Sequence, residues 1–109
     1  ASALADAATN AAEFAANNVR FVQADVGASQ ALAAEQWDLA ILDPPRSGCP
    51  GSVLEVLDAA RLAYASCDPT TLARDLRLLT QRGYRLDSVR LFDMFPQTYH
   101  IETLALLSR

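Results

Sequence analysis

Disulfide frameworks, metal clusters and membrane spans find little support in these 109 residues. The chain has two cysteines and one histidine. Two cysteines are too few for a domain held together by several disulfides, and together with one histidine they give little basis for a metal site. None of its apolar runs approaches the roughly 20 residues that a membrane-spanning helix needs. With 51% hydrophobic and 20% charged residues, the composition is that of one small soluble domain. We therefore expect free thiols and a cytoplasmic location.

A basic excess is also missing. The formal net charge is −4, whereas a domain that binds nucleic acid by itself usually carries excess positive charge. If the protein handles RNA, most of its phosphate contacts are expected to lie elsewhere. Five arginines nevertheless gather in the last third of the chain, where a solvated face is the simplest interpretation: Arg74, Arg77, Arg82, Arg85 and Arg90.

Helices and strands alternate along the predicted chain, which indicates a mainly parallel α/β sheet. Val53, Val56, Leu57 and Ala60 follow the i, i+3, i+4, i+7 spacing of one helix face. The last two strands have a connection short enough for an antiparallel pair. The expected elements are a helix over 3–17, a strand over 19–23 (VRFVQ), a short helix over 28–35, a strand over 39–42, the helix around 53–60, a strand over 62–65, a helix over 69–81, and strands over 84–91 and 101–107.

The helix over 69–81 has the clearest boundaries. Asp68 is a favourable N-cap, Pro69 suits the first helical position, and Gly83 suits the position just past the end. Its buried stripe is expected to consist of Leu72, Leu76 and Leu79.

Cys67 ends the strand before this helix, and open α/β sheets place their chemistry at the carboxyl ends of strands. The helix dipole favours an anion there, and a thiolate is the reactive form of cysteine. Asp68 opposes this by its charge unless its carboxylate is turned toward the helix amides. A lone cysteine at a strand end is also often a small buried hydrophobe. Cys49 lies in a Gly/Pro loop, and we assign it no role.

Two further segments carry candidate side chains. In ILDPPRSG, two prolines stiffen the turn after a buried strand and leave Asp43 at the sheet edge, although the turn could be merely rigid and Arg46 could simply pair with a carboxylate. Glu102 opens an apolar strand, where it suits proton transfer if buried or is simply exposed. His100 is expected to be structural. The aromatic residues of the preceding loop could stack on a base or pack on the sheet: Phe92, Phe95 and Tyr99.

Taken together, DPPRSG, YASCDPTTLARDL and DMFPQTYHIETLALLSR resemble, in this order and spacing, the C-terminal part of the RNA uracil-5-methyltransferases. The resemblance implies a Rossmann-like class I fold, with S-adenosyl-L-methionine as methyl donor and tRNA or 23S rRNA as partner. Cys67 matches the family's catalytic cysteine and Glu102 its proton-abstracting glutamate, with His100 also in place. Asp43 and Arg46 match the Asp-Pro-Pro-Arg motif at the donor and the uracil, and Asp25 matches a position that contacts the adenosyl group.

The resemblance also implies what these residues would do. A Cys67 thiolate would add to C6 of uracil, C5 would attack the donor methyl group, and Glu102 would remove the C5 proton. The family's first two strands and its glycine-rich loop have no counterpart in residues 1–109. We therefore expect a single-domain C-terminal fragment with a partial sheet, weak donor binding and little activity alone. A non-catalytic protein-interaction module is the alternative.

The partial sheet would expose a strand edge. In the family's sheet, the two strands without a counterpart lie between VRFVQ and LAILD. An apolar edge without a neighbour favours pairing with another strand. The sequence therefore predicts that VRFVQ pairs directly with LAILD, or that two copies of the chain dimerise through the exposed edge.

Overall fold

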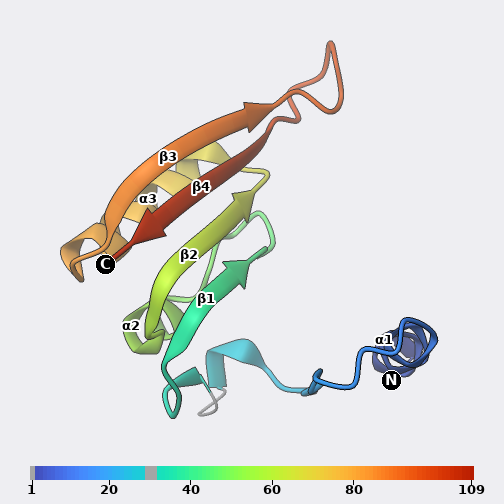
Figure 1. Ribbon diagram of the computed structural model, residues 1–109. Helices are drawn as coiled ribbons and strands as arrows, with labels where there is room; N and C mark the ends of the chain where they lie inside the picture. The colour runs from blue at the N-terminus through green and yellow to red at the C-terminus, as the bar shows by residue number, and fades with distance from the viewer. Residues whose placement is uncertain (1, 29–31) are drawn as a thin grey trace.

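The computed structural model describes residues 2–28 and 32–109. Four strands form one mixed sheet in the order β1-β2-β4-β3, and helices α2 and α3 lie behind it in Figure 1. The elements in chain order are α1 (Ser2–Glu13), the 3₁₀ turn η1 (Val26–Ala28), β1 (Trp37–Leu42), α2 (Gly51–Val56), β2 (Ala59–Ser66), α3 (Pro69–Gln81), β3 (Arg85–Phe92) and β4 (Glu102–Ser108).

The sequence predicts a mainly parallel sheet with an antiparallel final pair, and the sheet has one parallel and two antiparallel pairings. Strands β1 and β2 pair in parallel, with Leu42 opposite Tyr64. Strand β4 runs antiparallel to both β2 and β3, which confirms the antiparallel arrangement of the final two strands. Because β4 is inserted between β2 and β3, its amino end lies beside the carboxyl ends of β2 and β3.

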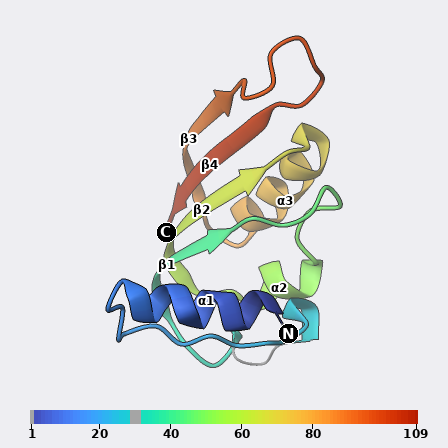
Figure 2. The same ribbon diagram turned by 90° about the vertical axis from the view of Figure 1, so that its right-hand side faces the viewer.

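The hydrophobic core lies between the sheet and the two helices on one of its faces. Figure 2 shows α2 and α3 on the same side of the strands. Alternate residues of β2 and β4 point toward these helices, as expected for strands with one buried face. The core includes the buried side chains of Val53, Leu54, Leu57, Leu62, Tyr64, Leu72, Leu79, Tyr84 and Leu107.

Helix α3 begins and ends where the sequence predicts. The Asp68 carboxylate accepts hydrogen bonds from the amides of Thr70 and Thr71, at 2.9 and 3.1 Å, so it is turned toward the helix. Pro69 is the first helical residue. Gly83 follows the helix with φ = +93°, a backbone conformation that glycine adopts without steric cost.

Four local predictions are wrong or lie in part outside the described residues. The helix expected over 3–17 ends at Glu13. Residues 19–23 form no strand, because no other strand among residues 2–28 and 32–109 lies beside them to supply ladder hydrogen bonds. Helix α2 ends at Val56, and Ala60 lies in β2, so the predicted stripe crosses an element boundary. The short helix over 28–35 lies partly in residues 29–31, outside the described residues, and η1 precedes it.

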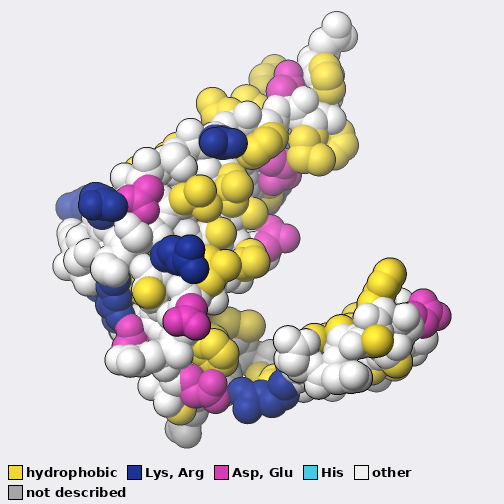
Figure 3. All heavy atoms as spheres, viewed as in Figure 1, with side chains coloured by type: hydrophobic (Ala, Val, Ile, Leu, Met, Phe, Trp, Pro, Cys, Tyr) yellow, Lys and Arg dark blue, Asp and Glu magenta, His cyan; other side chains and the backbone are white. Residues whose placement is uncertain are grey.

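The amino-terminal region stands apart from the sheet. Helix α1 and the extended segment after it project from the start of β1 in Figure 1. Phe14 is 82% exposed, and Ile41, on the outer strand β1, is 73% exposed. Figure 3 shows further hydrophobic side chains across the sheet face that no helix covers. The predicted pairing of VRFVQ with LAILD is therefore wrong within this single chain.

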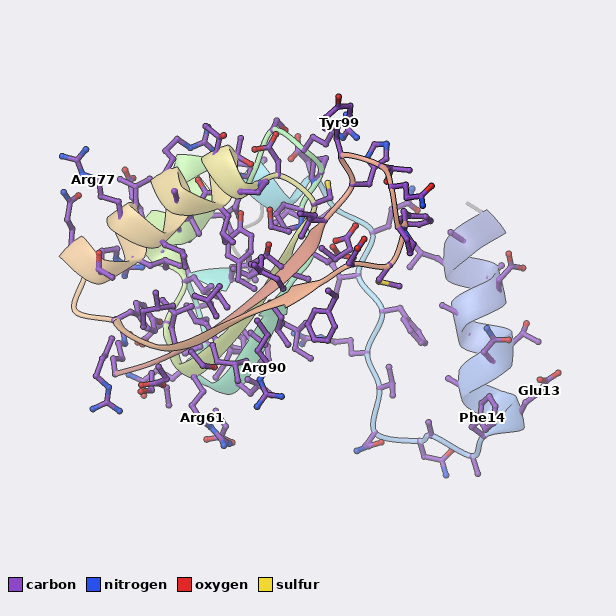
Figure 4. All side chains as sticks on the ribbon, turned by 90° about the horizontal axis from the view of Figure 1, so that it is seen from above. Glu13, Phe14, Arg61, Arg77, Arg90 and Tyr99 are labelled. Carbon is purple, nitrogen blue, oxygen red and sulfur yellow. The ribbon has the colours of Figure 1, made fainter. Side chains whose placement is uncertain are left out.

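The carboxyl-terminal arginines do not form one solvated face. Arg74 pairs with the buried Asp75, and Arg82 donates to the carbonyl groups of Leu54 and Leu57 at the end of α2. Figure 4 shows Arg77 pointing outward from α3, whereas Arg90 lies on the opposite side of the sheet. The interpretation as a single solvated face is thus wrong for Arg74 and Arg82. Within residues 2–28 and 32–109, no helix is long and apolar enough to cross a membrane.

Candidate active site at one edge of the sheet

Three strand ends bring the candidate catalytic residues to one edge of the sheet. This edge is formed by the carboxyl ends of β1 and β2 and is not the side of an outer strand. Asp43 follows β1, Cys67 follows β2, and Glu102 begins β4. The last pair of the β2–β4 ladder is Ser66 opposite Thr103, so Cys67 and Glu102 each adjoin one residue of this pair. Residues opposite each other in an antiparallel ladder are neighbours. The topology therefore brings the predicted nucleophile and base, 35 positions apart in sequence, to adjacent strands.

Hydrogen bonds around Cys67 fix its backbone in a bend. The hydroxyl of Ser66 accepts from the amide of Asp68 at 3.1 Å and lies 3.0 Å from the Asp68 carbonyl, to which it donates. Cys67 itself is half-buried. Because Ser66 and the Asp68 cap hold both flanking residues, the thiol is presented from a defined turn at the start of α3.

Glu102 is half-buried at the start of β4. It pairs through the β3–β4 ladder with Phe92, so its backbone is held by the end of β3. Among the residues that the structure describes, no ion pair or hydrogen bond involves its carboxylate. This carboxylate is available to a bound molecule.

Asp25 and Asp43 line one cleft. The cleft has a volume of about 530 Å³ and is walled by aliphatic side chains of β1 and by the prolines of the loop after it. Asp25 accepts a hydrogen bond from the amide of Gly27 at 2.9 Å, and the Ser52 hydroxyl donates to the Gly27 carbonyl at 3.2 Å. The two aspartates that the family resemblance selects thus lie on a common cavity, although 18 positions separate them.

The loop after β1 rests on a buried carboxylate that the sequence analysis missed. Asp75 of α3 is fully buried. It accepts hydrogen bonds from the Tyr64 hydroxyl, from the amide of Cys49 at 2.7 Å, and from Arg74 at 2.9 Å. The sequence did hold a signal, because Asp75 falls among Leu72, Leu76 and Leu79 on the apolar side of its helix.

Burial and the Asp75 charge alter the acidity of the groups around this carboxylate. The pKa of the Cys49 thiol rises from 9.0 to about 11, first because of burial and then because of the neighbouring negative charge. Burial and the hydrogen bond to Asp75 also raise the pKa of the Tyr64 phenol. Cys49, predicted to have no role, is thus a buried, protonated thiol whose amide anchors the loop.

Arg46 and His100 join two loops at the edge of the site. The guanidinium Nη2 of Arg46 lies 2.9 Å from Nδ1 of His100. The suggestion that Arg46 pairs with a carboxylate is therefore wrong within the described chain. The Phe95 ring meets the His100 ring edge to face, at 6.3 Å between centroids.

The loop between β3 and β4 extends beyond the sheet. All residues from Phe92 to Ile101 are exposed, and Tyr99 projects from the tip of this loop in Figure 4. The Tyr99 ring is fully exposed and the Phe95 ring meets His100, so the suggestion that the loop aromatics pack on the sheet is wrong for these two residues. Phe92 is the last residue of β3. Among the described residues, no group of three or more His, Cys, Asp or Glu side chains is placed to hold a metal ion.

The fold is that of the Rossmann-like methyltransferases. A solved structure of Pyrococcus abyssi tRNA (uracil-54, C5)-methyltransferase, in complex with S-adenosyl-L-homocysteine, superimposes with a TM-score of 0.75 at 32% identity. It matches over 92% of this chain and 24% of that one. Residues 3–109 match the tRNA (uracil-5-)-methyltransferase family. The chain belongs to this family, which confirms the resemblance seen in the sequence.

Relatives with similar sequences include ribosomal RNA enzymes. The chain is 48% identical, over 97% of its length, to the 23S rRNA (uracil(1939)-C(5))-methyltransferase RlmD of Pseudomonas fluorescens. It is 45% identical, over 83% of its length, to an uncharacterized RNA methyltransferase of Thermotoga maritima. The matches cover 25% and 21% of these two proteins, so the chain spans about a quarter of the length of its relatives.

Proposed function

We propose that this chain is the carboxyl-terminal part of the catalytic domain of an RNA methyltransferase that modifies C5 of a uridine. The observation that carries the proposal is the convergence of Asp43, Cys67 and Glu102 at one sheet edge. Membership of the uracil-5-methyltransferase family supports it. An RNA substrate and two free thiols favour a cytoplasmic location. Alone, the chain is expected to be inactive, because it spans only a quarter of its relatives.

The cleft between Asp25 and Asp43 fits S-adenosyl-L-methionine. Its two carboxylates suit the positive sulfonium and the ribose hydroxyls, and its aliphatic walls suit the adenine ring. When bound, this molecule supplies the methyl group. We expect weak binding by the 109-residue chain because the cleft is open to solvent. Calorimetric titration measures this, and submicromolar affinity would contradict it.

Cys67 and Glu102 would act on the uracil ring from adjacent strands. The Cys67 thiolate forms a bond with C6, and the electron pair of the C5–C6 double bond moves to C5 and O4. C5 would then bond to the methyl carbon that the donor supplies, as the sulfonium–methyl bond breaks and its electron pair leaves with the sulfur as S-adenosyl-L-homocysteine. Glu102 removes the C5 proton, the C5–C6 double bond reforms, and the sulfur–carbon bond breaks to return the thiolate. Asp43 and Arg46 would hold the polar edge of the base.

The target uridine must leave its stack to reach this edge. The exposed aromatic side chains of the loop before Glu102 could stack on neighbouring bases, since Phe95 and Tyr99 are free of the sheet. The relatives act on ribosomal or transfer RNA, and both remain candidate substrates.

Trapping the covalent adduct tests the proposal. RNA that carries 5-fluorouridine cannot release fluorine as a cation, so a complete enzyme containing this chain should form a stable adduct after methylation. Cys67→Ala should abolish the adduct, whereas Cys49→Ala should retain it. Glu102→Gln should accumulate adduct on ordinary uridine RNA. Adduct formation by the Cys67→Ala enzyme would refute the assignment of the nucleophile.

Selective alkylation provides a test that needs no RNA. Cys67 is half-exposed, whereas Cys49 is buried with a raised pKa. Iodoacetamide should therefore modify Cys67 well before Cys49, as followed by mass spectrometry of the two peptides. Faster modification of Cys49 would contradict the described arrangement.

The exposed edge of β1 supports a second candidate role, an interaction module that dimerises. Leu39 and Ile41 are exposed along this strand, and such edges pair readily with other strands. Light scattering at increasing concentration should show a dimer, and Ile41→Lys should return the chain to a monomer. A monomer at all concentrations would contradict dimerisation and leave the catalytic proposal unaffected.

A further inference from the structure

We propose that Thr71, Arg74 and Asp75 of α3 are positioning residues that hold Arg46 against His100 and so fix the two loops of the active site. The inference rests on the proposed function for its catalytic consequence. Its structural part stands on contacts within the chain. The helix that starts beside Cys67 also holds the loop after β1, so both parts of the site share one support.

Three side chains of α3 form hydrogen bonds with backbone groups of the loop after β1, within residues 46–49. The Thr71 hydroxyl donates to the carbonyl of Arg46 at 2.9 Å. Arg74 donates through Nη2 to the carbonyl of Ser47 at 2.9 Å. Asp75 accepts from the amide of Cys49 at 2.7 Å. The contacts lie on successive turns of one helix face, and together they fix the loop on both sides of Gly48.

The loop approaches these side chains so closely that only glycine fits at position 48. Gly48 has φ = +81°, and a Cβ atom there would lie 2.5 Å from Arg74 Nη2 and 2.6 Å from Asp75 Oδ2. Asp75 is fully buried, and a buried carboxylate requires hydrogen-bond donors. Tyr64, Arg74 and the Cys49 amide supply them. The need to satisfy Asp75 therefore draws the loop onto the helix.

With its backbone held, Arg46 directs its side chain to the other loop. A guanidinium only donates hydrogen bonds, so Nδ1 of His100 must accept, and the His100 proton must lie on Nε2. The contact spans 54 positions in sequence and ends two residues before Glu102. Arg46 thus links the loop of Asp43 to the segment that leads into the proposed base.

The single histidine of the chain provides a direct readout. Ring ¹⁵N spectra of the 109-residue chain, at a pH where imidazole is neutral, report the hydrogen bond to Nδ1. Arg46→Met defines the signal without the contact. Thr71→Val should shift the Nδ1 resonance part of the way toward this reference, and Asp75→Asn further. An amide spectrum that stays dispersed verifies that each variant is folded.

Thr70→Val is the matched control, because its hydroxyl makes no hydrogen bond within the described residues while its amide is capped like that of Thr71. It should leave the Nδ1 resonance in place. If Thr71→Val behaves like Thr70→Val, or if Arg46→Met leaves the resonance unchanged, the inference is overturned. Should Asp75→Asn fail to fold, Thr71→Val decides.

Kinetics of the complete enzyme test the catalytic consequence. Because loss of the network displaces groups at the reacting edge, Asp75→Asn should lower kcat by about 100-fold, the scale of a 1 Å misplacement. Arg74→Lys, which retains the charge, should restore much of the activity lost in Arg74→Ala. A shifted ¹⁵N resonance with unchanged kcat would overturn the catalytic part. An enzyme in which even Cys67→Ala is fully active would instead refute the proposed function.

Discussion

The segment before β1 and the layer formed by β2 and α3 contain similar fractions of apolar residues. The large apolar side chains are mostly exposed in the first region and mostly buried in the second. Phe14 and Val22 lie exposed in or near an extended segment, whereas Leu62 and Leu79 are fully buried. The difference lies in their neighbours. Strand β2 has β1 on one side and β4 on the other, while residues 19–23 pair with none of the strands in the described part of the chain.

This contrast shows that strand-forming residues do not make a strand alone. The backbone over residues 19–23 has no regular structure and connects α1 with η1, although it contains residues that favour strands: Val19, Phe21 and Val22. Ladder hydrogen bonds come only from a partner strand. The stable part of the molecule should therefore be the sheet with α2 and α3, and substitutions should have unequal effects in the two regions.

The largest difference in the free energy of unfolding is expected between alanine substitutions of a buried and an exposed leucine. Leu62 is 1% exposed and Leu39, on the neighbouring strand, is 47% exposed. Leu62→Ala should lower the free energy of unfolding by about 2–5 kcal/mol, because it leaves a cavity in the buried core. Leu39→Ala should cost about 1 kcal/mol or less. Urea denaturation measures both, and equal losses would show that the outer strand is covered.

Two glycines three positions apart, Gly48 and Gly51, should change the free energy of unfolding in opposite directions when replaced by alanine. Gly48→Ala should destabilise the fold by about 1–3 kcal/mol, because its φ is positive and its Cβ would meet Arg74 and Asp75. Gly51 begins α2 and has open space around it, so Gly51→Ala should stabilise by about 0.4–1 kcal/mol. Thermal unfolding followed by circular dichroism distinguishes them. A neutral Gly48→Ala would mean that the loop can lift from α3.

The buried thiol should make the fold sensitive to alkali. Below pH 9.0 the Cys49 thiol is protonated in both states, and its folded pKa is about 11. As pH rises between these values, only the unfolded chain loses the proton, so stability falls by at most about 1.4 kcal/mol per pH unit. Cys49→Ala should lack the part of the decline that begins near pH 9.0, whereas Cys67→Ala should keep it. Above pH 10.0 the Tyr64 phenol, whose pKa is also raised on folding, should add a decline of its own in every variant. Urea unfolding across this pH range provides the measurement.

Local chemistry explains which features could be predicted from the sequence. The boundaries of α3 follow from Asp68, Pro69 and Gly83, which act within a few residues of chain. The sites of Asp43 and Cys67 follow from strand ends, and the family resemblance selected both. Their catalytic roles, and those of Asp25 and Glu102, stay predictions that the trapping experiment can test.

Features that depend on distant contacts escaped prediction. The Asp75 network joins β2, α3 and the loop after β1, and no short window of sequence contains all three. The helix spacing of Val53 and Ala60 continues across the α2–β2 boundary, so periodicity alone misplaced that end. Arg46 and His100 form a hydrogen bond although 54 positions separate them, and neither motif contains a pattern that predicts this contact.

The smallest effect is expected where the same ion-pair chemistry occurs on the surface. Arg85 Nε lies 2.8 Å from Asp87 Oδ1, and the Ser108 hydroxyl together with Arg85 lowers the pKa of Asp87 below its usual 3.8. The carboxylate therefore stabilises the fold above that pH, and the contribution is lost as pH falls through the lowered value. Asp87→Asn should remove this small acid dependence, and high salt should weaken it in the wild type. Solvent already screens this pair, so Asp87→Asn should lower the free energy of unfolding much less than Asp75→Asn does in the same urea titration. Equal losses would contradict the contrast between a buried carboxylate that organises a loop and an exposed one that does not.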